Sequence, residues 1–370
     1  MRTVAVVTSL TPMATGRYLI EALRATGVRT FVVSDVPDPL ADACRPGLVD
    51  VAGLLAGHGI QPDFVLFVEG GSMALFPAGL ERLACPTAWY GIDTHMDYEK
   101  HVRIGRLFDA TFVAQKEYVG RLRADGVHQV YWLPLAFEPS LHPDPEPERT
   151  LDIAHVGSGQ VQVNPERHRL LDRLRERFPS NRFGPASPQE MGRIYASSRT
   201  VFNRSVNNDV NMRFFEAAGA GAVLVTDRLL DYGVDELFEE GRHFVTYTDG
   251  DSLVRAVESL LASPATCGEM GRAARLHVLA HHTYVHRARA LQAAMAGAAK
   301  GRPPAPADLF AALLAMGLVD GALDAAARAI GAAGGGRLSR QAARLAAGWT
   351  RIAAAGARLL TAASRARPGR

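Results

Sequence analysis

The sequence has few cysteines and no long apolar run. Its three cysteines, Cys44, Cys85 and Cys267, are far apart and form no paired spacing. This pattern argues against a disulfide framework or a cysteine zinc site and is typical of a reducing compartment. No uninterrupted apolar stretch approaches the roughly 18 residues of a membrane-spanning helix. The first apolar run, Val4 to Val7, lacks the cleavage pattern of a signal peptide. We therefore expect a soluble, cytoplasmic protein.

Acidic residues are absent from the last part of the chain, 337–370, which contains eight arginines. An apolar side chain and an arginine each recur every seven residues there, at Leu338, Leu345, Ile352 and Leu359 and at Arg337, Arg344, Arg351 and Arg358. As a helix, this segment would be amphipathic and basic, with Trp349 on a neighbouring face, which predicts peripheral membrane contact. The alternatives are a helix packed on the protein itself, a subunit contact or an unstructured tail. The rest of the chain is mildly acidic, which does not indicate nucleic-acid binding.

Short apolar segments alternate with segments of helical spacing along the first 137 residues. The apolar segments are bounded by Gly, Pro, Asp or Ser and are apolar on both faces, which predicts buried parallel strands at Thr3–Val7, Thr30–Val33, Phe64–Val68, Thr87–Tyr90, Thr111–Ala114 and Val130–Leu133. Arg17 to Ala25 has the spacing of a helix, with a stop at Gly27. The alternation predicts a doubly wound parallel sheet.

A proline-rich segment then interrupts the pattern. Glu138 to Glu148 contains four prolines, which exclude helix and inner strand alike. Afterwards the alternation restarts, with strands predicted at Ile153–Val156, Arg182–Phe183, Val201–Asn203, Val223–Thr226 and His243–Thr246. Helices are predicted near Pro165–Arg177, Pro188–Ala196, Val210–Ala218, Ser252–Leu261 and Cys267–Ala280. We therefore predict an α/β protein of two tandem Rossmann-like domains, 1–137 and 151–300, joined by a linker at 138–150 and followed by a helical extension at 301–370. A cleft between the two sheets is the expected ligand site.

The segment from Asn203 to Asp227 is the most informative for function. A strand ends at Asn203, and a helix is expected to begin near Asp209, a good N-cap residue. The start of a helix suits a phosphate group. Arg213 and Glu216 share a helix face close to that start. A cation for a diphosphate and a carboxylate for ribose hydroxyls are what nucleotide-sugar binding requires. The alternative is an ordinary surface ion pair next to apolar core residues.

This segment resembles the nucleotide-sugar signature of the GT-B glycosyltransferases, most closely the CgeB-like group. The matching residues are Asn211, Met212, Arg213, Phe215, Glu216, Ala217 and the strand Val223–Asp227. The resemblance continues through 240–247 and ends in His282-Thr-Tyr-Val-His-Arg287, and it also includes His155-Val-Gly-Ser-Gly159. The similarity covers about residues 150 to 295, whereas the first domain is similar only in its general layout.

The resemblance implies roles for individual residues. Glu216 would bind the donor ribose, Arg213 would lie near the diphosphate, and Asn211 belongs to the same signature. Gly157, Ser158 and Gly159 would allow close approach of the backbone to the donor, and Tyr247 would either stack on the base or lie at the edge of the core. Many retaining GT-B enzymes have a second glutamate eight positions before the first. Here that position is Asn208, which retains the ability to hydrogen-bond a sugar hydroxyl but leaves the retaining mechanism in doubt.

The first domain is expected to supply the acceptor side. Asp93 and His95 follow the fourth predicted strand, so they lie at the carboxyl edge of the sheet, and either is a candidate base for an acceptor proton. The alternatives are that Asp93 caps the next helix and that His95 is merely exposed. Glu69, in another loop at the same edge, is a lesser candidate.

The sequence predicts no metal site and no bound cofactor. His282 and His286 are four residues apart, but no carboxylate ligand accompanies them, and the resemblance also implies metal-independent transfer. The predicted function is transfer of a sugar from a UDP- or GDP-type donor, UDP being favoured, to an unidentified acceptor. The alternatives are a nucleotide-sugar epimerase of the same fold and a non-catalytic protein that binds sugar nucleotides. A dehydrogenase is disfavoured because the first strand is not followed by G-x-G-x-x-G.

Overall fold

The fold is described from a computed structural model, which places residues 2–12, 14–70, 74–145, 148–157, 164–229, 232–301, 304 and 306–317. The predicted basic tail at 337–370 lies outside the described residues, as do Ser158 and Gly159 of the predicted glycine turn. Within the described residues, no helix is both long and apolar enough to cross a membrane.

The first domain is built on a parallel sheet of seven strands in its described residues, in the order β3-β2-β1-β5-β7-β8-β9. These strands are β1 (Thr3–Val7), β2 (Arg29–Ser34), β3 (Ala43–Cys44), β5 (Phe64–Val68), β7 (Thr87–Gly91), β8 (Ala110–Val113) and β9 (Val130–Trp132). A separate parallel pair is formed by β4 (Gly47–Asp50) and β6 (Leu75–Ala78). The helices are α1 (Thr15–Ala25), α2 (Val51–Gly57), α3 (Tyr98–Gly105) and α4 (Glu117–Ala124). Every residue of β5 and β7 is buried, as expected for central parallel strands covered on both faces.

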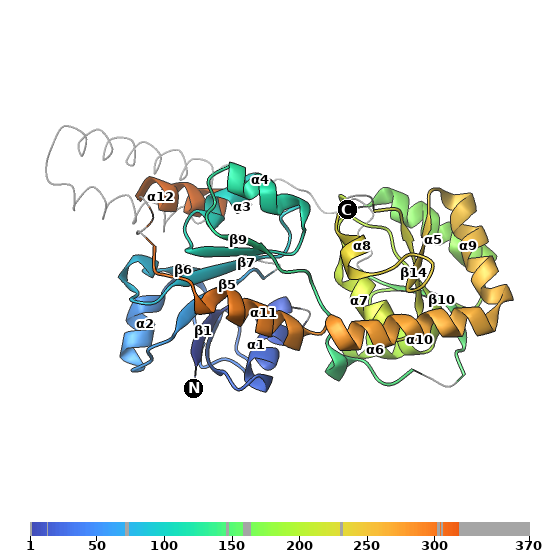
Figure 1. The fold of residues 1–370 in the computed structure, drawn as a ribbon, viewed down its shortest axis with the longest axis horizontal. Coiled ribbons are helices and arrows are strands. Elements are labelled where there is room, and N and C mark those ends of the chain that lie inside the picture. Colours follow the sequence, from blue (N-terminus) through green and yellow to red (C-terminus); the bar gives the residue numbers. More distant parts are fainter. Residues whose placement is uncertain are drawn as a thin grey trace, which may run out of the picture.

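The second domain repeats this plan with five described strands in the order β11-β10-β12-β13-β14, all parallel. They are β10 (Leu151–Val156), β11 (Asn181–Gly184), β12 (Ser198–Phe202), β13 (Val223–Asp227) and β14 (Phe244–Tyr247). Its helices are α5 (Pro165–Arg177), α6 (Pro188–Ala196), α7 (Met212–Gly219), α8 (Val234–Leu237), α9 (Gly250–Ala262) and α10 (Pro264–His281). Figure 1 shows the two domains as separate lobes, each with helices on both faces of its sheet.

Two segments cross between the domains side by side. The backbone N–H of Phe137, on the outgoing segment, donates to the carbonyl of His282 at 2.8 Å, and the N–H of Tyr284 donates back to Phe137 at 3.1 Å. After this crossing, α11 (Tyr284–Ala296) packs on α1 of the first domain (Figure 1). The buried guanidinium of Arg287 donates to the carbonyls of Pro134 and Leu135. The last part of the predicted family motif therefore connects the two domains.

The last described helix, α12 (Pro306–Ala315), also returns to the first domain. It packs against α3, and Ala312 and Leu313 are fully buried in the apolar core of that domain.

The structure confirms the predicted fold class, two parallel α/β domains followed by a helical segment. Most predicted strands and helices are found within two or three residues of the expected bounds. The pair β4–β6 was not predicted, since each strand is short and β6 contains a proline. The predicted domain boundaries remain predictions.

Candidate functional site

A cavity of about 510 Å³ lies between the two domains. Its lining includes Asp93 and His95 from the first domain, and Gly157, Arg213 and Glu216 from the second. These residues follow the carboxyl ends of β7, β10 and β12, the edge where open α/β sheets bind ligands. The structure therefore brings together, in one cavity, predicted residues of both domains.

The loop between β12 and α7 reaches the first domain. The side-chain amide of Asn207 donates to the carbonyl of His95 at 3.0 Å, and that of Gln115 donates to Asp209 at 3.0 Å. The loop turns through left-handed backbone conformations, with φ of 49° at Asn207 and 61° at Asn208, which asparagine tolerates better than most residues. These contacts hold the second domain against the loops that follow β7 and β8. We call the first of these loops, 92–97, the acceptor-side loop after its predicted role.

The predicted start of α7 at Asp209 is wrong. The N-cap is Asn211, whose side chain accepts from the N–H of Arg213 at 3.1 Å. Asp209 is instead buried at the interface between the domains, and burial is the main cause that raises its pKa to about 6. Its attachment to Gln115, distant in sequence, replaces the local capping role that the sequence suggested.

The guanidinium of Arg213 is held at the end of β10 by three neutral acceptors. It donates to the hydroxyl of Tyr195 at 3.2 Å, to Oδ1 of Asn203 at 2.6 Å and to the carbonyl of Val156 at 2.8 Å. A Cβ on Gly157 would lie only 3.2 Å from Nη2 of Arg213, so glycine allows the backbone to pass close to this cation. Since the acceptors are neutral, the positive charge of Arg213 is not cancelled by them.

Arg167 provides a second cation that the sequence reasoning missed. It lies in the first turn of α5, is only 7% exposed and lines the cavity. Its Nε and Nη2 are buried without a hydrogen-bond partner among the described residues. Burial and the nearby charge of Arg213 lower its pKa. A cation at the start of a helix opposes the helix dipole, and this anomaly in Asn164-Pro-Glu-Arg167 was the available sequence signal.

His155 has a further unpartnered nitrogen in the same region. Its Nδ1 lies 3.0 Å from the carbonyl of Phe202, whereas Nε2 is buried with no partner in the described part of the chain. Burial, followed by the charge of Arg213, lowers its pKa well below the ordinary value, so this imidazole is neutral. Buried polar atoms without partners are rare in native proteins and require an explanation, such as a ligand.

Glu216 is buried on α7, facing the same cavity. It is 6% exposed, and its carboxylate makes no hydrogen bond or ion pair within the described residues. Burial raises the pKa of Glu216 to about 7, although the charge of Arg213 acts in the opposite direction. The alternative interpretation, an exposed ion pair between Arg213 and Glu216, is therefore wrong. A desolvated carboxylate with free oxygens is suited to accept hydrogen bonds from two adjacent hydroxyls.

Asp93 and His95 form the opposite wall. Asp93 is exposed to the cavity, and desolvation by its surroundings, followed by the charge of Glu69, raises its pKa. It does not cap the next helix, because the N-cap of α3 is Asp97, which accepts from the N–H of Lys100 at 3.3 Å. His95 also lines the cavity, and its Nδ1 is buried without a partner among the described residues.

Two predicted donor-binding residues do not line this cavity. Tyr247 is 4% exposed, and its hydroxyl donates to the carbonyl of Asn203 at 2.9 Å while its ring stacks on Phe202. It therefore lies in the core, as its alternative interpretation held. Asn208 donates to the hydroxyl of Tyr232 at 2.8 Å.

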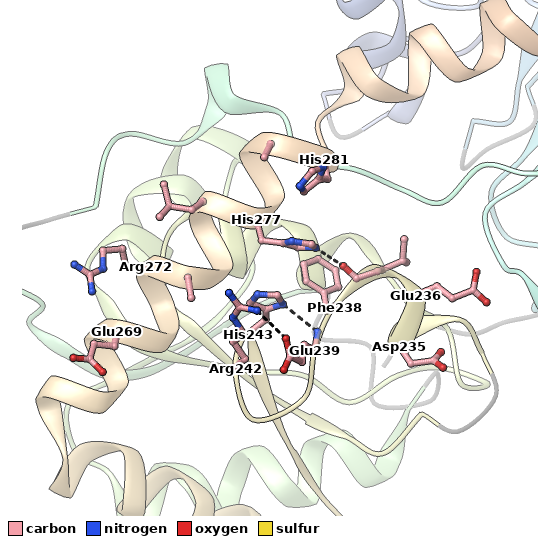
Figure 2. A pocket seen from close by; sticks show the side chains of 14 residues that line it. Asp235, Glu236, Phe238, Glu239, Arg242, His243, Glu269, Arg272, His277 and His281 are labelled. Atoms are coloured by element: carbon pink, nitrogen blue, oxygen red, sulfur yellow. Dashed lines mark hydrogen bonds and ion pairs between the residues drawn. The ribbon is translucent and has the colours of Figure 1, made fainter.

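A larger hollow of about 640 Å³ lies elsewhere, between α8, α10 and the segment that precedes β14 (Figure 2). The rings of His243 and His277 stack there at 4.5 Å with an interplanar angle of 19°. Nε2 of His277 lies 2.7 Å from the carbonyl of Leu237, and Nδ1 of His243 accepts from the N–H of Glu239 at 3.0 Å. These contacts are internal, so we place the candidate site between the domains. Within the described residues, no group of three or more His, Cys, Asp or Glu is placed to hold a metal ion.

Comparisons with known proteins bear on the second domain and on the overall fold. Residues 150–293 match the model of a family described as glycosyl transferase-like. No curated protein matches the sequence significantly. The fold resembles Anabaena HepE in complex with UDP and glucose, with a TM-score of 0.57 and 13% identity over 80% of this chain and 100% of that one. It also resembles sucrose-phosphate synthase from Thermosynechococcus elongatus, with a TM-score of 0.56 and 13% identity over 79% of this chain and 98% of that one. For T4 phage BGT in complex with UDP and Mn²⁺, the TM-score is 0.54, with 11% identity over 79% and 99%. The second domain thus matches a glycosyl transferase-like family over residues 150–293, and the whole chain has the two-domain GT-B fold of these glycosyltransferases.

Proposed function

We propose that the protein is a glycosyltransferase that takes a hexose from a UDP-type donor, which is bound in the cavity between the domains. One observation carries the proposal: two cationic side chains, Arg167 and Arg213, line the same wall, and Arg167 has two buried nitrogens without partners. A buried, unpaired cation is unfavourable unless an anion joins it. A diphosphate supplies such an anion, and its oxygens match the fork of a guanidinium group.

The remaining parts of the donor are assigned by chemistry. The two ribose hydroxyls donate to Glu216, whose carboxylate has no other hydrogen-bond donor in the described part of the chain. The base lies along the less polar part of the lining, which includes Pro185, Ala186 and Met191. The sugar then points towards the first domain, where Asp93 and His95 line the cavity.

The transfer forms one bond and breaks another. An acceptor hydroxyl attacks C1 of the hexose, a glycosidic bond forms, and the bond from C1 to the diphosphate oxygen breaks with its electron pair on UDP. Asp93 takes the hydroxyl proton, since its raised pKa brings it closer to the working pH than an ordinary aspartate. Arg213 and Arg167 stabilise the negative charge that develops on the departing diphosphate.

Calorimetric titration with UDP and GDP tests the donor site. Arg167→Gln should weaken the affinity for UDP roughly 10- to 150-fold, the range for losing hydrogen bonds to a charged group. Arg169→Gln is the matched control, because Arg169 lies two residues along α5 with a side chain that is 79% exposed. Equal affinities for UDP in the wild type and both variants would show that the diphosphate does not bind at this wall. Tighter binding of GDP than of UDP would show that the donor carries guanine instead of uracil.

Release of UDP from UDP-glucose separates the possible functions. A transferase accelerates this release when an acceptor is added. An epimerase converts the donor without an acceptor, and a non-catalytic protein binds UDP but releases none from the sugar. We further propose that the transfer is metal-independent, so that the rate should be the same in EDTA and in Mn²⁺.

We also propose peripheral membrane contact through residues 337–370, on the basis of their sequence pattern. The full chain should sediment with anionic liposomes, and a chain that ends near Arg302 should not. Equal sedimentation of the two would overturn this proposal.

A further inference from the structure

A buried polar network lies directly beneath the acceptor-side loop. Oε2 of Glu69, just after β5, accepts from the backbone N–H of Ile92 at 2.6 Å and of Asp93 at 3.0 Å. Its Oε1 lies 3.1 Å from Nε2 of His101 on α3. Nδ1 of His101 lies 3.0 Å from the hydroxyl of Thr94. The network thus returns to the loop from which it starts and binds it at three successive residues.

The carboxylate at the centre of this network is charged. Glu69 is 6% exposed, and burial by itself would raise its pKa. The contact with His101 and the two backbone N–H groups outweigh burial and hold the pKa of Glu69 below its ordinary value. Burying a charge and an imidazole under an exposed loop is costly compared with an apolar core of the same shape. A purely structural support for the loop does not need this charge.

We propose that Glu69 is a positioning residue for the transfer reaction: its carboxylate fixes the backbone of Asp93, so that the Asp93 side chain points into the cavity, and it places a second negative charge beneath that side chain. This inference rests on the proposed function, in which Asp93 accepts the acceptor proton. Glu69 does not touch the substrate and acts only through Asp93.

Glu69 is one of several titratable or charged groups that act on the carboxyl group of Asp93. Four of these groups, Glu69, His95, Lys100 and His101, belong to the first domain. The fifth, Asp209, lies in the loop between β12 and α7 of the second domain. Desolvation and Glu69 raise the pKa of Asp93, whereas His95, His101 and Lys100 lower it. Because like charges disfavour ionisation of each other, removing the charge of Glu69 should lower the pKa of Asp93.

The test is a titration of the Asp93 carboxyl by ¹³C NMR in the full chain with labelled aspartate, assigned through Asp93→Asn. Glu69→Gln keeps an oxygen for both backbone N–H groups and removes the charge. The Asp93 titration should shift to lower pH in Glu69→Gln and should not shift in Glu99→Gln, an exposed carboxylate on α3. An unchanged titration in a folded Glu69→Gln protein would overturn the proposal.

A second variant separates the two parts of the role. Glu69→Ala removes the acceptor of both backbone N–H groups, so UDP release from UDP-glucose should fall more than in Glu69→Gln, while the affinity for UDP remains that of the wild type. Rates in Glu69→Ala equal to those in Glu69→Gln would contradict the positioning role. The NMR titration needs neither donor nor acceptor, so it reports on Glu69 even if UDP does not bind and the proposed function fails.

Discussion

The two walls of the cavity are built in opposite ways. On the second-domain wall, Arg167 has two buried nitrogens with no partner among the described residues, and the charge of Arg213 faces only neutral acceptors. On the first-domain wall, Asp93 is supported by Glu69, whose oxygens all have donors. The cations of the first arrangement lack an anion, whereas in the second the backbone that carries Asp93 is already held in place, although Nδ1 of His95 has no partner among the described residues. We therefore propose that one wall is organised for binding and the other for chemistry.

The largest effect is expected at the wall assigned to chemistry. Asp93→Asn removes the proposed base, and UDP release from UDP-glucose in the presence of glycoside acceptors should slow by about 10²- to 10⁴-fold. The dissociation constant for UDP should stay the same, because Asp93 lies on the opposite wall from the cations. Steady-state rates and calorimetry together check both expectations.

The matched control is Asp97→Asn, four residues away at the N-cap of α3, where asparagine caps as well as aspartate. If Asp93→Asn weakens UDP binding as much as it slows release, the two walls do not have separate roles.

The next largest effect is expected at the opposite wall. Arg213→Met should weaken UDP binding roughly 10- to 150-fold, since a charged donor of several hydrogen bonds is lost. Arg193→Met, on the exposed side of the neighbouring α6, is the control. The affinity of the wild type should also fall with ionic strength, and that of the variant should fall less. A salt dependence that is identical in both proteins would show that Arg213 does not contact the diphosphate.

The same difference between the walls explains how much could be predicted from the sequence. Arg213 and Glu216 lie on one short helix after a strand, so their spacing alone indicated a site. Arg167 was missed because its partner cation is 46 positions away and meets it only through the fold. Glu69 was only a lesser candidate, because its contacts with Ile92 and His101 depend on the pairing of β5 with β7.

Local rules of the sequence also failed where the domains meet. Asp209 is a residue type that is favoured at N-caps, but the N-cap of α7 is Asn211, two residues further along. Asp209 instead accepts a hydrogen bond from Gln115 of the other domain. A capping preference amounts to about 1 kcal/mol, which a tertiary contact overrides easily. The parallel strands were found more reliably, because their burial on both faces leaves a pattern in the residues themselves.

A third effect, of similar size, is expected at Glu216, with opposite signs for stability and binding. The folded-state pKa of about 7 lies above the ordinary 4.5, so ionisation of Glu216 opposes folding. This penalty is absent below about pH 4.5, grows as the pH rises and is complete above about pH 7, where it reaches about 3 kcal/mol. Glu216→Gln should therefore be more stable than the wild type at pH 8 and equally stable near pH 4.5, as measured by urea unfolding.

The binding part of this prediction has the opposite direction. Ribose hydroxyls that donate to Glu216 favour its ionised form, so UDP binding near pH 6.5 should release a proton. Calorimetry in buffers of different ionisation enthalpy measures this release, and Glu216→Gln should abolish it while weakening the affinity. Proton release that persists in the variant would have to come from another group, and Glu216 would then not be the ribose ligand.

The smallest effect is expected where the two walls touch. Gln115→Ala removes the hydrogen bond to Asp209. Such a bond to a charged acceptor contributes about 1.5 to 3 kcal/mol. Because water replaces part of this contact when the domains separate, only the remainder is lost. UDP release should slow by less than about 10-fold and the affinity for UDP should hardly change, since the cations belong to one domain. Asn207→Ala, which removes the more exposed contact to His95, should have a still smaller effect. The radius of gyration from X-ray scattering should increase in Gln115→Ala, because the separated state gains population. If it stays constant while the rate falls, Gln115 acts locally, either on Asp209 or through its other hydrogen bond, to the carbonyl of Ile92 beside Asp93, and the wall assigned to chemistry must then include Gln115.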